Sequence, residues 1–167
     1  MDKAKHIKLI VLIPIYKVKY SKLKEIVFFL KDKVYKIICI DDCCPFKTGQ
    51  KLKKDKFKNL YIITNKKNLG VGGAMKKGLR FIQKFKYDYA IKIDGDGQLN
   101  PKDGLNMAKY AYSNNFDYVV GNRFDEKIKN YKSMPKSRWF GNKILSIFSK
   151  ISTRQYHLND FLNGLIC

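Results

Sequence analysis

Five short apolar runs alternate along the chain with stretches of helical spacing, and this alternation limits the folds that the chain can adopt. Most of the runs are continuously apolar, as expected for strands that are covered on both faces of a sheet. Strands that alternate with helices favour an α/β fold with a mainly parallel sheet flanked by helices. The predicted strands are residues 7–15, 35–41, 60–64, 89–94 and 118–121, and the predicted helices are residues 21–33, 71–85 and 101–115.

The charge of the chain is strongly positive, because 35 Lys and Arg stand against 14 Asp and Glu and give a formal net charge of +21. Such a field attracts polyanions in general, including nucleic acid, anionic lipid head groups and pyrophosphates. The basic residues are spread along the whole chain, which is also typical of a solvated surface without a specific partner. A nucleic-acid-binding module would show basic and aromatic residues clustered on a known scaffold. Since no such motif appears, we expect no specific nucleic-acid partner.

The length of 167 residues predicts a single domain, residues 1–167. The four cysteines include no C-x2-C pair and predict neither a zinc site nor a disulfide framework, and Cys39 is interpreted as a small core residue. A reducing, cytoplasmic setting fits this cysteine usage.

No signal peptide is visible, and the apolar run at residues 9–15 is far shorter than the ~20 residues that span a bilayer. We therefore expect a cytoplasmic protein, either free or peripheral on the inner face of the membrane.

Polar and charged residues stand where the predicted strands end. In parallel α/β sheets, ligands bind beyond the carboxyl ends of the strands. The first strand ends at Pro14 and Tyr16, the second at Asp41 and Asp42, the fourth at residues 94–96 and the fifth at residues 121–123. Three of the five strands thus deliver charged groups to one edge of the sheet.

A D-x-D motif follows the fourth predicted strand, at Asp94 and Asp96, and the next residues are Gly97 and Gln98. Two carboxylates one residue apart on a glycine turn can converge on one cation, and Gln98 offers a further oxygen. Oxygen ligands suit Mg²⁺ or Mn²⁺, which keep open positions for substrate phosphates. The alternative is a solvated Asp-Gly turn. The buried strand before the motif and the predicted helix that begins at Pro101 favour the metal site.

Two further segments permit both a functional and a structural interpretation. Asp42 could accept hydrogen bonds from a base or ribose, or it could cap a loop. Residues 68–74, with Asn68 and Gly72, open a predicted helix whose free N–H groups favour anions. The same glycines could instead permit close packing of helix on strand. The segment lacks the P-loop pattern and is a poor dinucleotide-binding fingerprint.

In order and spacing, these motifs resemble those of family 2 of the inverting glycosyltransferases, which have the GT-A fold. The similarity is strongest to the branch of polyprenyl-phosphate sugar transferases that includes the dolichol-phosphate mannosyltransferases. The family's V-x-I-P-x-Y-N corresponds to residues 11–17, D-D-x-S-x-D-x-T to 41–48, N-x-G-x-x-x-A to 68–74, D-A-D-x-Q-x-x-P to 94–101, G-S-R to 121–123 and D-x-x-S-G-F to 160–165.

The resemblance implies an activity and a set of roles. The activity is metal-dependent transfer of a sugar, with inversion, from a UDP- or GDP-linked donor to a polyprenyl phosphate. The implied metal ligands for Mg²⁺ or Mn²⁺ are Asp94, Asp96 and Gln98. The implied catalytic residues are Asp96, Arg123, Arg138 and Asp160, where the two arginines grip phosphate and Asp160 is the base for a hydroxyl acceptor. The implied substrate-binding residues are Pro14, Tyr16, Asp42, Asn68, Gly72, Asp94 and Arg123, with Asp42 at the nucleotide base.

The sequence also departs from the family pattern. Lys17 replaces the usual Asn, Cys43 and Cys44 replace small polar residues, and Asn163 stands where Ser is usual. The chain ends at residue 167, so we expect a complete donor-binding half and a shortened acceptor side. Two alternatives therefore stay open: a transferase that acts on a saccharide hydroxyl in cell-surface polysaccharide synthesis, and a truncated, inactive nucleotide-sugar-binding relative. A sugar nucleotidyltransferase is disfavoured, because it would carry G-x-G-T-R directly after the first strand.

Residues 138–151 show helical spacing with a basic polar side. Such a helix could lie on an anionic membrane surface, where a polyprenyl carrier would be found. Packing of the same apolar stripe on the core is the ordinary interpretation.

Overall fold

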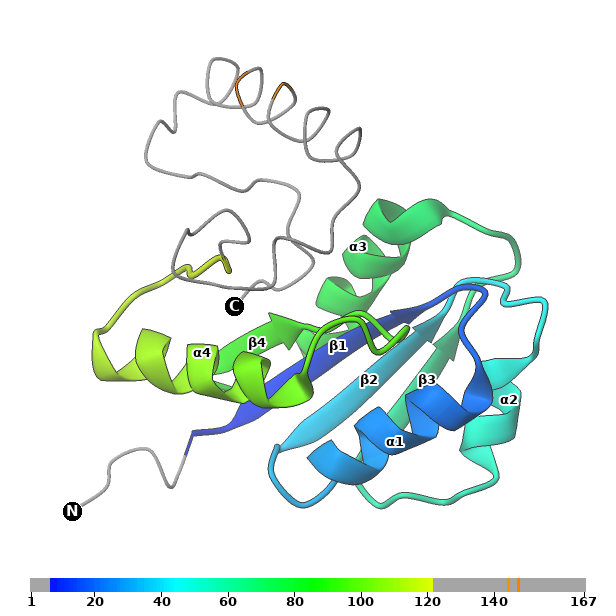
Figure 1. The fold of residues 1–167 in the computed structure, drawn as a ribbon, viewed down its shortest axis with the longest axis horizontal. Helices are drawn as coiled ribbons and strands as arrows, with labels where there is room; N and C mark the ends of the chain where they lie inside the picture. The colour runs from blue at the N-terminus through cyan, green and yellow to red at the C-terminus, as the bar shows by residue number, and fades with distance from the viewer. Residues whose placement is uncertain (1–6, 122–143, 145–146, 148–167) are drawn as a thin grey trace.

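A computed structural model describes residues 7–121 of the chain, together with residues 144 and 147. Its centre is a four-stranded parallel sheet in the order β3-β2-β1-β4, flanked by helices (Figure 1). The elements are β1 Leu9–Ile15, α1 Tyr20–Leu30, β2 Lys36–Asp41, α2 Thr48–Lys53, β3 Leu60–Thr64, α3 Gly70–Ile82, β4 Tyr89–Lys92 and α4 Pro101–Ser113.

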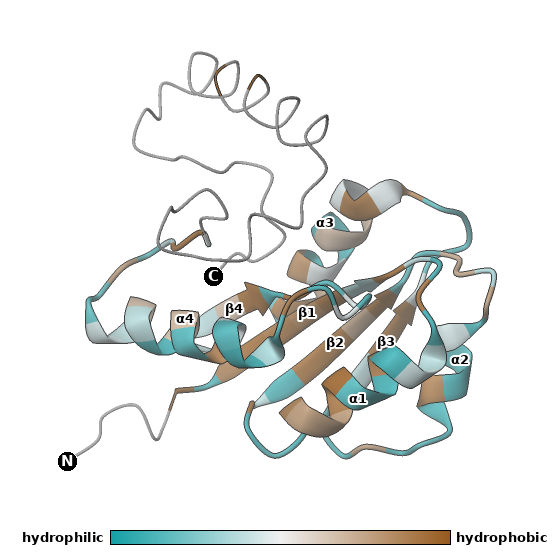
Figure 2. Ribbon diagram, in the orientation of Figure 1, coloured by the Kyte–Doolittle hydropathy of each residue, from teal (hydrophilic) through white to brown (hydrophobic). Residues whose placement is uncertain are grey.

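Both faces of the sheet are buried, which explains why the strands are continuously apolar. Successive side chains of a strand point to opposite faces. One set of β1 side chains, with Val11 and Ile13, joins the core cluster that includes residues of α1, α2 and α4. The other set, Ile10 and Leu12, packs with α3 through Ala74. Figure 2 shows the apolar character of the strands between more polar helix surfaces.

The first four predicted strands and all three predicted helices are confirmed, with ends displaced by a few residues. The predicted fifth strand is wrong within the described residues: at 118–121 only Val120 forms a β-bridge, and Tyr118 is 57% exposed. Helix α2 was not predicted, because its six residues contain a single apolar side chain, Leu52. The predicted start of α4 is confirmed, since the Asn100 side chain accepts a hydrogen bond from the Lys102 N–H (3.0 Å).

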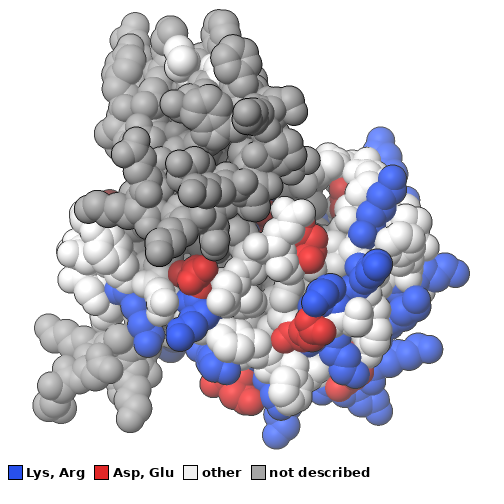
Figure 3. All heavy atoms as spheres, in the orientation of Figure 1, with Lys and Arg blue, Asp and Glu red and all other residues white. Residues whose placement is uncertain are grey.

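The burial of Cys39 is also confirmed, and burial raises the pKa of its thiol, which keeps the sulfur protonated. None of the helices in the described part of the chain is long and apolar enough to cross a bilayer. Lys and Arg side chains are dispersed over the described surface that Figure 3 presents, with Asp and Glu between them. This distribution fits the interpretation of much of the positive charge as a solvated surface.

Asp41 attaches α2 to the end of β2. Its buried carboxylate accepts hydrogen bonds from the backbone N–H groups of Cys44 (2.8 Å) and Gly49 (3.0 Å). The Thr48 hydroxyl donates to the carbonyl of Val18 (2.6 Å) and so ties the first turn of α2 to the loop after β1. A short helix with one apolar side chain is therefore held largely by polar contacts with the strand ends.

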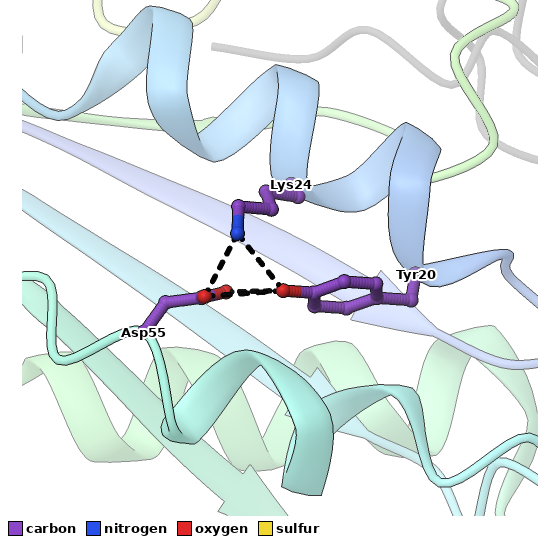
Figure 4. Close-up of polar contacts among 3 residues, drawn as sticks. All are labelled: Tyr20, Lys24 and Asp55. Carbon is purple, nitrogen blue, oxygen red and sulfur yellow. Dashed lines mark hydrogen bonds and ion pairs between the residues drawn. The ribbon is translucent and has the colours of Figure 1, made fainter.

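Tyr20, Lys24 and Asp55 connect α1 to the segment after α2 (Figure 4). The Asp55 carboxylate accepts hydrogen bonds from the Tyr20 hydroxyl (2.9 Å) and the Lys24 ammonium (2.9 Å), and Lys24 also donates to the Tyr20 oxygen (3.0 Å). The hydrogen bond from Lys24, together with that from Tyr20, holds the pKa of Asp55 below its ordinary value. The hydrogen bonds to Tyr20 and Asp55 raise the pKa of Lys24.

We expect Gly49→Ala to destabilise the fold by about 1–3 kcal/mol, because a Cβ at residue 49 would overlap the Asp41 carboxylate oxygen and lie 2.9 Å from the Asp41 Cβ. The matched control is Gly72→Ala in α3, where a Cβ would meet nothing within 4 Å. That change should be neutral or stabilising by up to about 1 kcal/mol. Urea unfolding measures both, and equal effects of the two changes would contradict this account of Gly49.

We expect the stabilisation from Asp55 to depend on pH. Because the folded pKa of Asp55 is lowered, its contribution is present above the ordinary aspartate pKa of about 3.9 and is lost as the pH falls through the lower, folded value. Asp55→Asn should therefore lower the unfolding midpoint most near neutral pH and progressively less in acid. Thermal unfolding between about pH 7 and about pH 2 tests this. If the unfolding midpoints of the wild type and Asp55→Asn differ by the same amount at every pH, the expected pH dependence is refuted.

Candidate functional site

A pocket of about 290 Å³ lies beyond the carboxyl ends of β1, β2 and β4, against the start of α3. This is the edge of the sheet at which the sequence predicts a ligand site. The pocket brings together six of the predicted site residues from four separate segments: Pro14, Tyr16, Asp42, Asn68, Asp94 and Asp96. Gly70, Val71 and Ala74 of α3 complete its other side.

Asp42 is 2% exposed and is held by donors from the loop between β3 and α3. Its Oδ1 accepts hydrogen bonds from the Asn65 side-chain amide (2.7 Å) and the Leu69 backbone N–H (2.9 Å), and the same N–H lies 3.0 Å from Oδ2. Asp42 therefore has the structural role of capping a loop, since its carboxylate holds the loop that carries Asn68. The carboxylate also lines the pocket, so a role toward a ligand is compatible with this geometry.

Lys77 extends this network from α3. Its ammonium donates to the Asn65 side-chain oxygen (2.7 Å) and to the carbonyl of Thr64 (2.9 Å). Asn65 is therefore fixed from both sides, by Asp42 and by Lys77. The position of the loop is set by three side chains from three different segments.

The N-terminus of α3 borders the pocket without a side-chain cap from its N-cap residue, Leu69. Asn68 instead accepts a hydrogen bond from the Gly70 N–H (2.8 Å), and Gly70 has a φ of 71°. The first turn contains no acidic residue, so its partial positive charge favours an anion in the pocket. Gly73 serves packing, because a Cβ there would lie 2.6 Å from that of Leu69. Gly72 is exposed and is not among the lining residues.

The D-x-D turn forms the third side of the pocket. The Gln98 N–H donates to Asp96 Oδ1 (2.9 Å), and the turn passes through Gly97 at a φ of 78°. This shapes a tight loop with Asp96 exposed and Asp94 half-buried. Gln98 is exposed and does not line the pocket, although its backbone orients Asp96.

Asp94 forms an ion pair with Lys92, whose ammonium lies 2.6 Å from Asp94 Oδ1. The Lys92 side chain is 12% exposed, against 33% for Asp94. This pair was not predicted, although the sequence carries a signal for it. Lys92 is the one charged residue in the apolar run 89–93 of the predicted strand 89–94, and in a strand it shares a face with Asp94.

Other predictions are only partly described by the structure. Arg123, Arg138, Asp160 and Asn163 lie outside the described residues, as does most of the predicted helix 138–151, and their roles stay predictions. The sequence reasoning also missed Asn65 and Lys77. Their side chains act through contacts with distant segments, for which the local sequence holds no signal.

The altered residues of the second motif occupy the loop after β2. Cys44 is buried, and its sulfur lies 3.6 Å from the Thr48 hydroxyl. Cys43 is exposed and has a φ of 59°, a conformation that side-chain-bearing residues rarely adopt. Neither cysteine lines the pocket.

Comparison with known sequences places these features in a family context. Residues 10–165 match the protein family described as "Glycosyl transferase family 2". An uncharacterized protein of Methanocaldococcus jannaschii is 30% identical over 137 residues, which is 81% of this chain and 54% of that protein. The UDP-N-acetylglucosamine–dolichyl-phosphate N-acetylglucosaminyltransferase of Methanococcus voltae is 34% identical over 103 residues, which is 62% of this chain and 40% of that protein. The chain thus spans about half, or less, of the length of these relatives.

Among solved structures, the crystal structure of S. aureus TarS residues 1–349 resembles this one with a TM-score of 0.53 and 20% sequence identity. The match covers 68% of this chain and 34% of that one. At this identity the likeness concerns the fold. It confirms the predicted α/β architecture of the GT-A type, with a mainly parallel sheet flanked by helices.

We expect Asp42→Ala to destabilise the fold by about 3 kcal/mol, because the buried Asn65 amide and the part-buried Leu69 N–H would lose a charged acceptor. Amide hydrogen exchange at residues 65–70 should accelerate as well. The control is Asp88→Ala, since Asp88 also accepts a backbone N–H, that of Lys8 (2.7 Å), but at an exposed site. It should cost about 1 kcal/mol or less. If both variants unfold at the same urea concentration, the proposed role of Asp42 in the loop is wrong.

Proposed function

Because this chain belongs to glycosyl transferase family 2, we propose that it transfers a sugar from a nucleotide-diphosphate sugar to an acceptor, with inversion at the anomeric carbon. The observation that carries this proposal is the pocket that joins Asp42, the Asp94–Asp96 turn and the start of α3. It combines an anion-favouring helix N-terminus with two carboxylates across the same cavity. A nucleoside diphosphate and a divalent cation together match these two requirements.

The base of the donor is proposed to lie at the Asp42 side of the pocket. Asp42 is fixed by the Asn65 and Leu69 hydrogen bonds, so its carboxylate is held in one orientation. Tyr16, which is 43% exposed, lies on the same cavity and offers an aromatic face for stacking. The first turn of α3 supplies backbone donors for the diphosphate.

Asp94 and Asp96 are the proposed ligands of Mg²⁺ or Mn²⁺. Their oxygen atoms suit these cations, and both carboxylates line one cavity. No group of three or more His, Cys, Asp or Glu side chains in a position to hold a metal occurs within residues 7–121. The donor's phosphate oxygens would therefore complete the ligand set. A bound cation would stabilise the negative charge of the leaving nucleoside diphosphate. Gln98 remains a proposed further ligand through its side-chain oxygen.

The proposed acceptor is a polyprenyl phosphate. The Methanococcus voltae relative is named for transfer to dolichyl phosphate, which supports this class. A phosphate acceptor is already anionic and needs little general base. Arg123 and Arg138 are proposed to bind phosphate groups, and residues 138–151 are the proposed contact with an anionic membrane surface. A saccharide hydroxyl is the second candidate acceptor, and it would require Asp160 as base.

Calorimetric titration of UDP, GDP and their sugar conjugates tests the donor site, with Mn²⁺, with Mg²⁺ and with EDTA. We expect one nucleotide to bind in a metal-dependent manner and Asp96→Ala to weaken this binding by about 100-fold or more, because one of two carboxylate ligands is lost. The control is Asp32→Ala, since the Asp32 side chain is 80% exposed and pairs with Lys31 in the turn after α1. It should bind as the wild type does.

Absence of nucleotide binding under every metal condition would overturn the donor-site proposal. Transfer of labelled sugar to polyprenyl phosphate, compared with transfer to saccharides, then separates the two acceptor classes. Product only in the organic phase would support the lipid phosphate. Product only in the aqueous phase would replace it by the saccharide hydroxyl.

A further inference from the structure

Lys92 is a charged side chain that is largely buried. It is the last residue of β4, pairs in register with Leu12 of β1, and is 12% exposed. Met75 and Leu79 of α3 line the same hollow beside β4, and Asp88 and Asp117 line it as well. An ammonium group in such surroundings is costly unless it is paired. Its ion pair with Asp94 offsets this cost and aims the charge at the edge of the pocket.

The ion pair changes the charge that the site offers to a cation. Asp94 and Asp96 carry two negative charges and Lys92 carries one positive charge, so the three side chains have a net charge of −1. The described residues provide no third acidic ligand at this place. A divalent cation in the empty pocket would be only half neutralised and would face a fixed ammonium group beside one of its two ligands. A nucleoside diphosphate would bring the missing negative charge.

We infer that Lys92 is a positioning residue that holds the Asp94 carboxylate at the pocket and keeps the affinity of the empty site for divalent cations low. The cation is then bound firmly only together with the nucleotide diphosphate. This inference rests on the proposed donor site, because it assumes that Asp94 and Asp96 bind the cation. It adds a role for a residue that belongs to neither the D-x-D motif nor the pocket lining.

The backbone supports this role. Residues two apart in an extended segment lie on the same face, so Lys92 reaches Asp94 without distortion of the strand. Backbone pairing with β1 continues between the two residues, since the Ile93 N–H donates to the carbonyl of Leu12 (3.0 Å). The sheet thus places the two backbone positions, and the ion pair of 2.6 Å joins their side chains. Repulsion of a cation by the ammonium group is strongest where water is partly excluded.

The test measures binding of Mn²⁺ to the protein without nucleotide, by the loss of the free-ion electron paramagnetic resonance signal. Wild type, Lys92→Met, Lys92→Arg and Lys22→Met are compared. Methionine keeps the length and suits the largely buried position of Lys92, so it removes the charge with little change in packing. Lys22→Met is the control for a general loss of charge near the D-x-D turn. The Lys22 stem lies beside Gly97, where a Cβ would be 3.6 Å from it, but its ammonium pairs with Glu25 at an exposed site.

We expect Lys92→Met to bind free Mn²⁺ about tenfold more tightly than the wild type, whereas Lys92→Arg and Lys22→Met change the affinity less than about threefold. Addition of UDP or GDP, whichever the protein binds, should raise the Mn²⁺ affinity of the wild type far more than that of Lys92→Met. A purely structural role for Lys92 predicts the opposite sign, because a disordered Asp94 would bind the cation more weakly. Circular dichroism and thermal unfolding establish that each variant is folded.

The outcomes separate this inference from the proposal on which it rests. Weaker or unchanged binding of free Mn²⁺ by a folded Lys92→Met protein overturns the role of Lys92, even where metal-dependent nucleotide binding is intact. Wild-type protein that binds free Mn²⁺ as tightly as it does with nucleotide also overturns it. Failure of wild type and variants alike to bind nucleotide with any metal is the failure of the donor site itself.

Discussion

The parallel pairing of β1 with β2 on one side and β4 on the other is the constraint on which the rest of this structure depends. It brings the carboxyl ends of these strands to one edge, so that segments separated by more than fifty residues meet there. The register carries Ile15 opposite Asp41, and the Asp42 N–H extends the ladder by donating to the Ile15 carbonyl (2.9 Å). Such a sheet is stable only with both faces covered. The helices that cover it also supply the walls of the pocket.

Four aspartates gather at this edge, and the structure divides them into two pairs. Asp41 and Asp42 are buried and accept backbone N–H groups, so their charges are compensated by the protein itself. They determine where α2 and the start of α3 lie. Asp94 and Asp96 are more exposed and sit on a turn rather than in a closed network. This division explains how one edge of the sheet can combine a rigid frame with carboxylates that remain open to a ligand.

The positive net charge of the protein is compatible with the proposed nucleotide-diphosphate-sugar donor, which is an anion. The net charge of +21 is dispersed, while the pocket itself contains the carboxylates and the helix N-terminus. A nucleotide diphosphate would be attracted by the overall field, and its orientation would then depend on the local groups. Lys92 is one of these local groups. It lies beside α3, and its ammonium forms an ion pair with Asp94, a carboxylate of the pocket.

The sequence by itself determined the four strands, the three longer helices and the concentration of carboxylates at one edge. These follow from apolar runs, helical spacing and the order of elements, all of which are local patterns. It did not reveal α2, whose single apolar residue leaves no periodic signal. It also predicted a strand at residues 118–121, where the structure has a single β-bridge residue, Val120. Only the tertiary structure decided the partners of Asp42, which are the Asn65 side chain and the Leu69 N–H. The physical reason is that such partners depend on the relative placement of loops and helices, which follows from packing of the whole sheet and which no short stretch of sequence encodes.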